Sequence, residues 1–331
     1  MPTRSHPDSG SDIPIITDRS GSIFRYLSYD KNARDKRDLE HVFSNGVTPE
    51  IIQYAQDKDH WLLYLLFNSK LRLSNPENFN DPYDCTIEFS SKMDYGVLIL
   101  LTINYYRRGI FSGEQKAILE QRLENKNLLG DIAGTNPKKS QTNLRNIKLS
   151  KQDKDLLITL CRQTLQNLVK ESRLICFSKT PDISLMWSHY TDKHSGYCLE
   201  FSLEQIKPHT NSDWQYLYEM QYRRTRPRIN LNPKEFFTLE MARKILLRKS
   251  PEWKYEEEVR YIHGHTSNEK LDSEYVTFPP TALKRIIFGA RMPENYRKAI
   301  QTIVSWLGQY RVRFAIAKPN PHKYKIDIED L

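Results

Sequence analysis

Two glutamates separated by one residue, Glu256 and Glu258, are the side chains of this sequence best suited to acid–base or electrostatic catalysis. The alternation of residues 256–263 predicts a strand, on which residues two apart point to the same face. Both carboxylates would then line one surface, where they could stabilise a positively charged sugar as a glycosidic bond breaks. The alternative is a pair of salt bridges with Lys254 and Arg260 on an exposed sheet face.

The segment between Cys176 and Phe201 supplies a second group of candidates. Its apolar ends, residues 174–177 and 197–201, predict two strands. Solvated connections favour Gly, Pro, Asn and Asp, whereas this one carries aromatic and hydrogen-bonding side chains. We therefore expect a loop that forms a pocket for a flat polar ligand. Its candidate ligand contacts are Trp187, Ser188, His189, Tyr190, Asp192 and His194. Trp187 would stack on the ligand or belong to the core, and the histidines would bond the ligand or lock the loop.

The run Phe79–Asp84, FNDPYD, is the densest turn signal in the chain. Asn80 and Asp81 can cap local N–H groups, and Pro82 fixes the turn. Alternatively, Asn80, Asp81 or Asp84 would hold a ribose or an acceptor. A third alternative is a nuclease site that binds Mg²⁺. That site would use Asp81, Asp84, Glu256 and Glu258 with Lys249, but no lysine follows the common Glu-x-Lys spacing.

A basic run near residue 225 is the best nucleic-acid candidate. Four guanidiniums within six residues could follow phosphates while the neighbouring tyrosine stacks on a base. These residues are Tyr222, Arg223, Arg224, Arg226 and Arg228. A net charge of +9 agrees with an anionic partner, although a solvated basic loop is the alternative. No Walker loop or dinucleotide-binding glycine pattern is present.

The bulk properties exclude several classes of protein. The 331-residue chain has a mean hydropathy of −0.68 and no apolar run long enough to cross a membrane, so no membrane partner is expected. The first 14 residues lack the apolar core of a secretory signal, and residues 1–21 predict a flexible tail. None of the four cysteines forms a Cys-x-x-Cys pair, and a metal site at His189 and His194 would need further ligands, for which Asp192 and Asp182 are the candidates. We expect a cytoplasmic protein without a metal.

Scattered strands and helices without regular βαβ alternation predict an α+β fold. Strands are expected at 23–29, 70–74, 214–222, 285–288, 311–317 and 324–328, besides those named above. Helices are expected at 60–70, 114–126, 156–169, 233–248 and from Pro293 onward. Ser112 and Gln115 form a capping box, and residues 127–151 predict a mobile loop. We expect one domain over residues 22–331, with a helical insertion at about 92–172.

Three motifs read in order give the chain a family resemblance. They are FNDPYD at 79–84, MWSHY at 186–190 followed by His194 and Gly196, and W-x-YE-x-E-x-R at 253–260. The set resembles a widespread bacterial family, the domain of unknown function 2971, over roughly Phe24 to Gly289. Members usually open with Tyr-Lys-Tyr-Arg, whereas this chain has Phe24-Arg25-Tyr26-Leu27. If the last arginine of that motif binds a ligand in the family, this chain lacks the interaction unless Arg25 replaces it.

The family is further similar to ADP-ribosyltransferases, and its members occur near toxin and defence genes. That resemblance implies a split, mostly antiparallel sheet and NAD as a substrate. It also implies a toxin or anti-phage effector that modifies a macromolecule, with a neutralising or regulatory protein partner. The catalytic candidates are Glu258, Glu256 and His189, in a scheme that also uses a basic residue on an early strand and a Ser or Tyr on a central one. The NAD-binding candidates are Arg25, Tyr26, Asn80, Asp81, Trp187, Ser188, Tyr190, His194 and Arg260. A metal-dependent nuclease and a non-catalytic nucleotide- or protein-binding module remain the alternatives.

Overall fold

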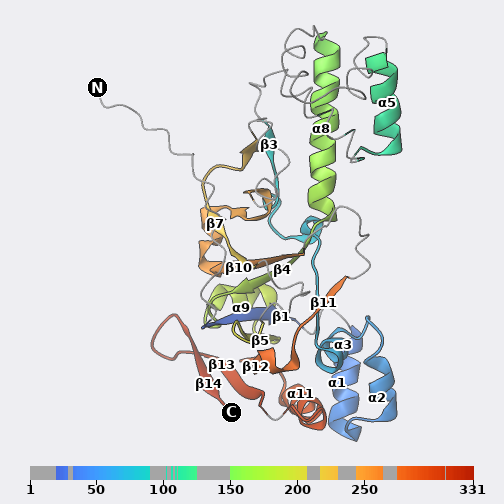
Figure 1. Cartoon of the computed structure of the whole chain (residues 1–331). Helices are drawn as coiled ribbons and strands as arrows, with labels where there is room; N and C mark the ends of the chain where they lie inside the picture. The colour runs from blue at the N-terminus through green and yellow to red at the C-terminus, as the bar shows by residue number, and fades with distance from the viewer. Residues whose placement is uncertain are drawn as a thin grey trace, which may run out of the picture. The chain divides into compact units, whose positions relative to one another are not determined.

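The computed structural model describes residues 20–28, 33–89, 102, 106, 109, 111–124, 150–206, 217–229, 244–263, 274–309 and 311–331 (Figure 1). The chain folds as two compact units. The helical unit comprises Met1–Ile13, Pro76–Glu171 and Arg223–Ser250, and the sheet unit comprises Pro14–Asn75, Ser172–Tyr222 and Pro251–Leu331. Most of the predicted tail, loop 127–151 and helix 233–248 lies outside the described residues. The single domain and the bounds of its insertion stay predictions.

An eight-stranded sheet forms the centre of the sheet unit. Its order is β14-β13-β12-β5-β1-β4-β10-β6, and only β12 and β13 run parallel. The strands are β1 (Ser22–Leu27), β4 (Arg173–Ser178), β5 (Tyr197–Ser202), β6 (Leu217–Glu219), β10 (Glu258–His263), β12 (Leu283–Gly289), β13 (Arg313–Pro319) and β14 (Ile326–Asp330). The α+β class and the mostly antiparallel sheet are therefore confirmed.

The sheet parts between β1 and β4. These strands share a single register pair, Phe24 with Ser178, whereas β1 and β5 share six, from Ser22 to Leu27. The guanidinium of Arg25 reaches across the gap and donates to the Cys176 carbonyl at 2.5 Å. The sheet thus consists of a five-stranded part and a three-stranded part that meet at one residue pair, as a split sheet requires.

Alternation along the strands divides the core into two layers. One sheet face, including Phe177, Leu199 and Phe201, packs with apolar side chains of the helices α1, α3 and α11. The opposite face, including Phe24 and Tyr26, packs with Trp187 and Met186. The helices of the sheet unit are α1 (Ala33–Asn45), α2 (Pro49–Tyr54), α3 (Trp61–Asn68), α9 (Ser184–Tyr190) and α11 (Glu294–Trp306), with the 3-10 turns η3 (Pro251–Glu256) and η4 (Pro280–Ala282).

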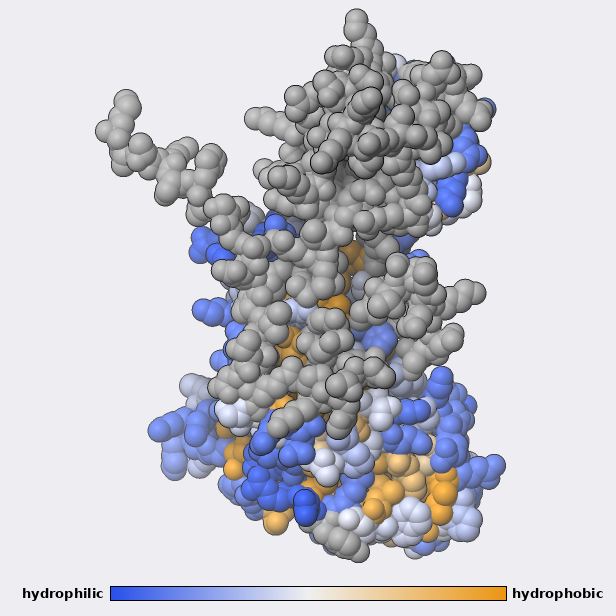
Figure 2. Space-filling model, viewed as in Figure 1, coloured by the Kyte–Doolittle hydropathy of each residue, from blue (hydrophilic) through white to orange (hydrophobic). Residues whose placement is uncertain are grey.

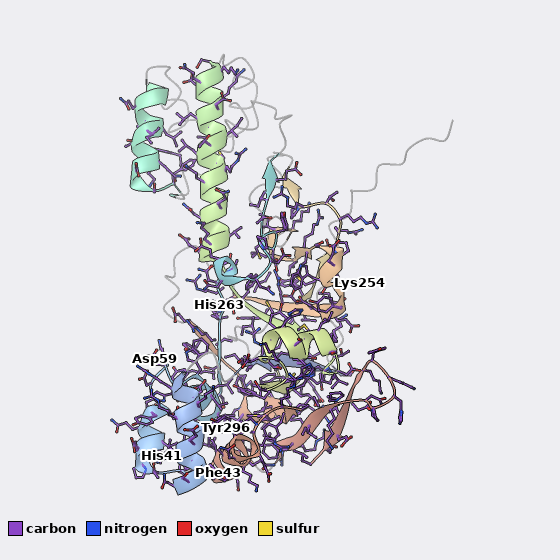
Figure 3. The ribbon with its side chains drawn as sticks, turned by 180° about the vertical axis from the view of Figure 1, so that it is seen from behind. His41, Phe43, Asp59, Lys254, His263 and Tyr296 are labelled. Atoms are coloured by element: carbon purple, nitrogen blue, oxygen red, sulfur yellow. The ribbon has the colours of Figure 1, made fainter. Side chains whose placement is uncertain are left out.

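The helices α1 and α11 of the sheet unit are joined by a hydrogen bond as well as by apolar packing. Tyr296 of α11 donates to the carboxylate of Glu40 in α1 at 2.8 Å, and Figure 3 shows Tyr296 near that helix. Phe43 and Trp306 of these helices stay exposed. Figure 2 shows hydrophobic residues in orange among the blue ones on the surface of the sheet unit. The short strands β2 (Lys70–Arg72) and β11 (Tyr275–Thr277) pair beside them.

The helical unit contains α5 (Gly113–Glu124) and α8 (Lys151–Glu171), which agree with two predicted helices. The capping box before α5 is confirmed, because the Gln115 N–H donates to the Ser112 hydroxyl while the Ser112 N–H donates to the Gln115 side chain. The unit also holds η1 (Pro76–Asn78), β3 (Glu88–Phe89), β8 (Arg228–Ile229) and β9 (Arg248–Lys249). Among the described residues, no helix is both long and apolar enough to cross a bilayer.

Candidate functional site

Glu256 and Glu258 do not share a strand, which corrects the sequence prediction. β10 begins only at Glu258, and Glu256 ends the 3-10 turn η3. Between them Glu257 adopts a left-handed backbone with φ of 44°. A non-glycine residue in that region costs free energy, and it reverses the local direction of the chain. The two carboxylates therefore cannot be placed by strand alternation.

Glu258 forms a buried ion pair with Arg260. The Arg260 Nε donates to Oε1 at 2.6 Å, and its NH2 group donates to Oε2 at 3.2 Å. Both side chains are buried, and Arg260 is fully so. Such a two-point contact fixes the orientation of the carboxylate. The sequence alternative of a salt bridge is thus confirmed for this pair, but on a buried face instead of an exposed one.

Three strands meet at the residue where the sheet parts. Ser178 at the end of β4 pairs with Phe24 of β1 on one side and with Glu258 of β10 on the other. Because paired residues of adjacent strands share a face, Ser178 and Glu258 lie side by side. Arg25 follows Phe24 and bridges the gap to β4. The structure thus brings together a serine and a glutamate on one sheet face, whereas Arg25 pairs with Leu199 and its side chain starts from the opposite face.

Ser178 was missed by the sequence analysis, which selected Ser188 for the same role. Ser188 instead lies exposed on α9, a helix where the sequence predicted a loop. The available signal was a serine at the last position of a predicted strand, but its importance depends on the register with β1 and β10. Ser178 is fully buried, and its hydroxyl accepts from the Thr180 N–H at 3.3 Å.

Trp187 is a core residue, which corrects its assignment as a stacking platform. Its ring is fully buried and lies edge-on to Tyr26, with 5.3 Å between the ring centroids. The indole N–H donates to the Pro181 carbonyl at 2.6 Å. Tyr26 is buried too and donates to the Thr180 carbonyl at 2.9 Å. Neither aromatic ring leaves a face for NAD to stack on.

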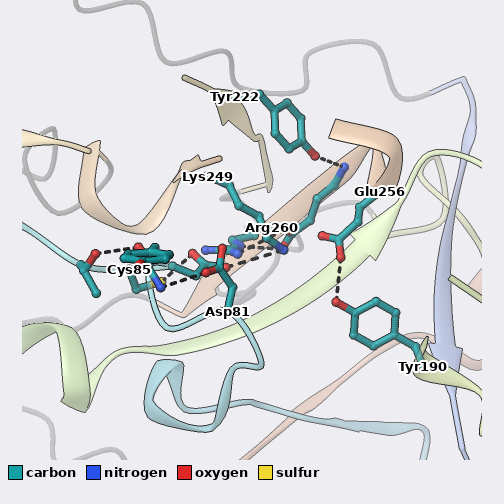
Figure 4. Close-up of polar contacts among 11 residues, drawn as sticks. Asp81, Cys85, Tyr190, Tyr222, Lys249, Glu256 and Arg260 are labelled. Carbon is teal, nitrogen blue, oxygen red and sulfur yellow. Dashed lines mark hydrogen bonds and ion pairs between the residues drawn. The ribbon is translucent and has the colours of Figure 1, made fainter. Parts of the chain in front are cut away.

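Tyr190 and Glu256 connect α9 to η3. The Tyr190 hydroxyl donates to Oε1 of the buried Glu256 at 2.7 Å (Figure 4). His189, its neighbour on α9, is exposed. The predicted motifs 186–190 and 253–260 therefore do converge, but through this tyrosine and not through the tryptophan or the histidine.

A left-handed turn follows α9. Asp192, Lys193 and His194 all have positive φ, of 48°, 54° and 71°. The His194 N–H donates to the Trp187 carbonyl at 3.1 Å, so the turn supplies a hydrogen-bond donor to a carbonyl group of the last turn of α9. His194 is half-buried, and its pKa is lowered by burial and by the charge of Arg291. Gly196 ends the turn where a Cβ would lie 2.2 Å from the Leu27 carbonyl oxygen.

The electrostatics around Glu258 disfavour a further negative charge. Cys176, the strand partner of Arg260, has its pKa raised to about 12 by burial and by the Glu258 carboxylate. Both causes favour the thiol over the thiolate, which makes Cys176 a poor nucleophile. The carboxylate of Glu258 is the anionic group beside the split.

The FNDPYD turn lies in the helical unit. Oδ1 of the buried Asp81 accepts from the Tyr83 N–H at 2.9 Å, whereas Asn80 is exposed. Asp84 pairs with Lys249 at 3.7 Å, and both are buried. The structural interpretation of this motif as a turn is confirmed. Nothing in these contacts links Asn80 or Asp81 to NAD, and their predicted role stays a prediction.

The nuclease alternative needs side chains that hold a metal ion. Among the described residues, no cluster of three or more His, Cys, Asp or Glu side chains is suited to this. Two of the residues named for that alternative, Asp84 and Lys249, form a direct ion pair.

The basic run is exposed at three of its arginines, Arg223, Arg224 and Arg226. Arg228 pairs through its backbone with Glu88. Tyr222 is half-buried in β7 (Gln221–Tyr222), where its hydroxyl accepts from the Glu258 N–H at 2.9 Å (Figure 4). This bond anchors the first residue of β10, and the stacking of Tyr222 on a base stays a prediction.

Comparison with known proteins identifies part of the chain. Residues 186–261 match the model of a family described as "Protein of unknown function (DUF2971)", so the chain carries a DUF2971 domain over that range. The predicted family resemblance is thereby confirmed for the second and third motifs, while FNDPYD lies outside the match. No curated protein and no solved structure matches the chain.

Proposed function

We propose that the sheet unit is an ADP-ribosyltransferase that takes NAD at the split between β1 and β4 and transfers ADP-ribose to a macromolecule. One observation carries this proposal: the row Phe24–Ser178–Glu258, which brings a serine and a glutamate together on one sheet face where β1 and β4 part. An arginine on an early strand, a serine on a central strand and a late glutamate are the groups that the family resemblance implies for this chemistry.

Each of the three side chains has a separate task. Arg25 starts from the opposite sheet face, but its guanidinium lies in the gap at the Cys176 carbonyl. There it would neutralise a pyrophosphate that passes between β1 and β4, since arginine is suited to phosphate oxygens. The Ser178 hydroxyl would hold the ribose near the carboxylate. Glu258 would stabilise the positive charge that forms at the ribose C1′. Arg260, bonded to Glu258 through two nitrogens, is a positioning residue that fixes the carboxylate.

The reaction breaks one bond and forms one. The C1′–N bond of NAD breaks, and its electron pair leaves with nicotinamide. A nucleophilic atom of the acceptor then bonds to C1′ and releases its proton to solvent. Neither an oxidant nor a metal ion is needed for this balance, so the transfer should proceed in the presence of a chelator.

Access to Glu258 requires movement, because its side chain is only 4% exposed. The segment best suited to move is η3 with Glu257, whose left-handed backbone stores strain next to the carboxylate. The Tyr190–Glu256 bond closes this segment against α9. NAD binding would break that bond and open the approach to Ser178 and Glu258.

Incubation with NAD labelled in its adenylate half tests the proposal. Purified protein would be mixed with the labelled NAD and with DNA, RNA or cell lysate, each with and without EDTA. We expect label on a macromolecule and free nicotinamide, both unaffected by EDTA.

Two other outcomes would contradict the proposal. Nucleic-acid cleavage that EDTA abolishes and that ignores NAD would identify a metal-dependent nuclease. Binding of NAD without release of nicotinamide under any of the acceptor conditions would identify a non-catalytic nucleotide-binding module.

A further inference from the structure

The FNDPYD turn presents an exposed aromatic ring next to an arginine. Tyr83 is 64% exposed, although the aspartates on either side of it, Asp81 and Asp84, are buried. The guanidinium carbon of Arg226 lies 6.0 Å from the centroid of the Tyr83 ring. A single exposed ring is ordinary on a protein surface. Tyr83 becomes a candidate contact for a partner because a guanidinium lies next to it.

The backbone around Tyr83 is fixed on both sides. Its N–H donates to Asp81 Oδ1 at 2.9 Å, and its carbonyl accepts from the Thr86 hydroxyl at 2.6 Å. The next two residues are also bonded to each other, because the Cys85 thiol donates to the Asp84 carboxylate. Cys85 itself has a left-handed backbone. The ring is therefore held in place before any partner arrives, which lowers the entropy cost of binding.

The arginine run is tied to the same turn by contacts within the helical unit. β3 and β8 pair in parallel, with Glu88 opposite Arg228, and the Glu88 N–H donates to the Pro227 carbonyl at 3.0 Å. The Arg223 N–H donates to the carbonyl of Lys249 at 3.0 Å, and the same lysine pairs with Asp84. Residues 81–89 and 223–229 thus form one surface.

This surface is cationic as well as aromatic. Arg223, Arg224 and Arg226 are exposed, and none of the three has an ion-pair partner among the residues that the structure describes. Guanidiniums that are not neutralised by carboxylates remain available for phosphates. The two aspartates of the turn are buried and have other partners: Asp81 accepts from the Tyr83 N–H, and Asp84 pairs with Lys249.

We propose that Tyr83 and the arginines Arg223, Arg224 and Arg226 form a binding site for single-stranded nucleic acid. The guanidiniums bind successive phosphates, and an unpaired base stacks on the exposed ring of Tyr83. Single strands fit better than duplexes, because their bases are free to stack on an aromatic side chain while the backbone follows the positive charges. Such a strand would be the acceptor in the proposed transfer, yet its binding requires no NAD.

Fluorescence anisotropy with labelled oligo(dT) and oligo(U) of about twenty nucleotides tests this site in the full-length chain. We expect Tyr83→Ala to weaken binding by about tenfold or more, with little change in the dependence on salt. Replacing the three arginines by alanine should weaken binding further and lower the salt slope by about 0.7 for each phosphate that is no longer neutralised.

Tyr324→Ala is the matched control, because Tyr324 is an exposed tyrosine too and has lysines on both sides, but it lies on the C-terminal hairpin of the sheet unit. It should bind both oligonucleotides like the wild type. Equal affinity of wild type and Tyr83→Ala would overturn the proposal. So would wild-type binding to poly-glutamate or to anionic lipid vesicles that matches its binding to oligo(dT), because the surface would then recognise charge alone. Neither result depends on whether the chain consumes NAD.

Discussion

Asp35 is the clearest case of a side chain whose ionisation opposes folding. It is buried in α1, accepts from the Leu62 N–H at the start of α3, and lies near Asp38. Burial, with a smaller contribution from Asp38, raises its pKa to about 7. Asp38 itself bonds His60, which precedes α3, at 2.6 Å. The junction of these two helices therefore carries two buried carboxyl groups, and burial raises the pKa of both.

The direction of the pH effect follows from that pKa. Asp35 holds its proton more tightly in the folded than in the unfolded chain, so its contribution to stability is present below about pH 4 and is lost as the pH rises through 7. We expect Asp35→Asn to stabilise the protein relative to wild type at pH 8 by about 1–4 kcal/mol, and by less at pH 5. Urea unfolding at both values measures this difference. If the free energies of unfolding of variant and wild type differ by the same amount at pH 5 and pH 8, Asp35 does not titrate in this range.

The sequence indicated which types of residue form the site, but not the role of each one. The types of residue at the site were recognised, including Arg25, Glu256 and Glu258. Their roles depended on burial and register, which one sequence does not reveal. Trp187 is a core residue, and Ser178 became a candidate only because β4 pairs with both β1 and β10.

At the scale of elements, the turn after α9 is the most constrained loop of the site. Three residues in succession adopt positive φ, and the turn ends on a glycine that packs against the β1 backbone. Sequence analysis predicted a loop here because the residues are polar and aromatic. It could not predict the helix α9, since seven residues make a helix too short to show a clear period.

Two substitutions in this turn should have opposite effects on stability. Lys193→Gly removes the strain of a Cβ at φ of 54°, and we expect a gain of about 1 kcal/mol, reduced by the extra freedom of glycine in the unfolded chain. Gly196→Ala places a Cβ 2.2 Å from the Leu27 oxygen and should cost about 2–4 kcal/mol. Chemical denaturation of both variants is the measurement. Destabilisation by Lys193→Gly would mean that its side chain, and not its backbone, is what the turn requires.

Most strands and helices of the described residues were predicted from periodicity and end signals. β1, β4, β5 and β12, for example, fall within a few residues of their predicted bounds. The start of β10 was misplaced because the YEEE run has no breaker residue. Its true limit is the left-handed Glu257, a conformation that glutamate rarely adopts.

At the scale of the molecule, the sheet unit and the helical unit carry different proposals. The sheet unit supplies the split, the buried Glu258–Arg260 pair and the Tyr190–Glu256 closure. The helical unit supplies the turn that displays Tyr83 and the exposed arginines. Sequence analysis could not divide the chain in this way, because the residues of each unit are interleaved along it. The proposed catalytic site and the proposed nucleic-acid site can therefore be disabled one at a time.

The central claim is that Glu258 supports cleavage of NAD at the parting of the sheet. Glu258→Gln and Glu257→Gln offer a matched pair, since both remove one carboxylate from the same segment, but only Glu258 pairs with Arg260 beside Ser178. Circular dichroism first establishes that both variants are folded, because disturbing a buried ion pair is destabilising. Release of nicotinamide from NAD is then measured per folded molecule. We predict a loss of at least about a hundredfold for Glu258→Gln and wild-type release for Glu257→Gln. Wild-type release by a folded Glu258→Gln protein would contradict the mechanism.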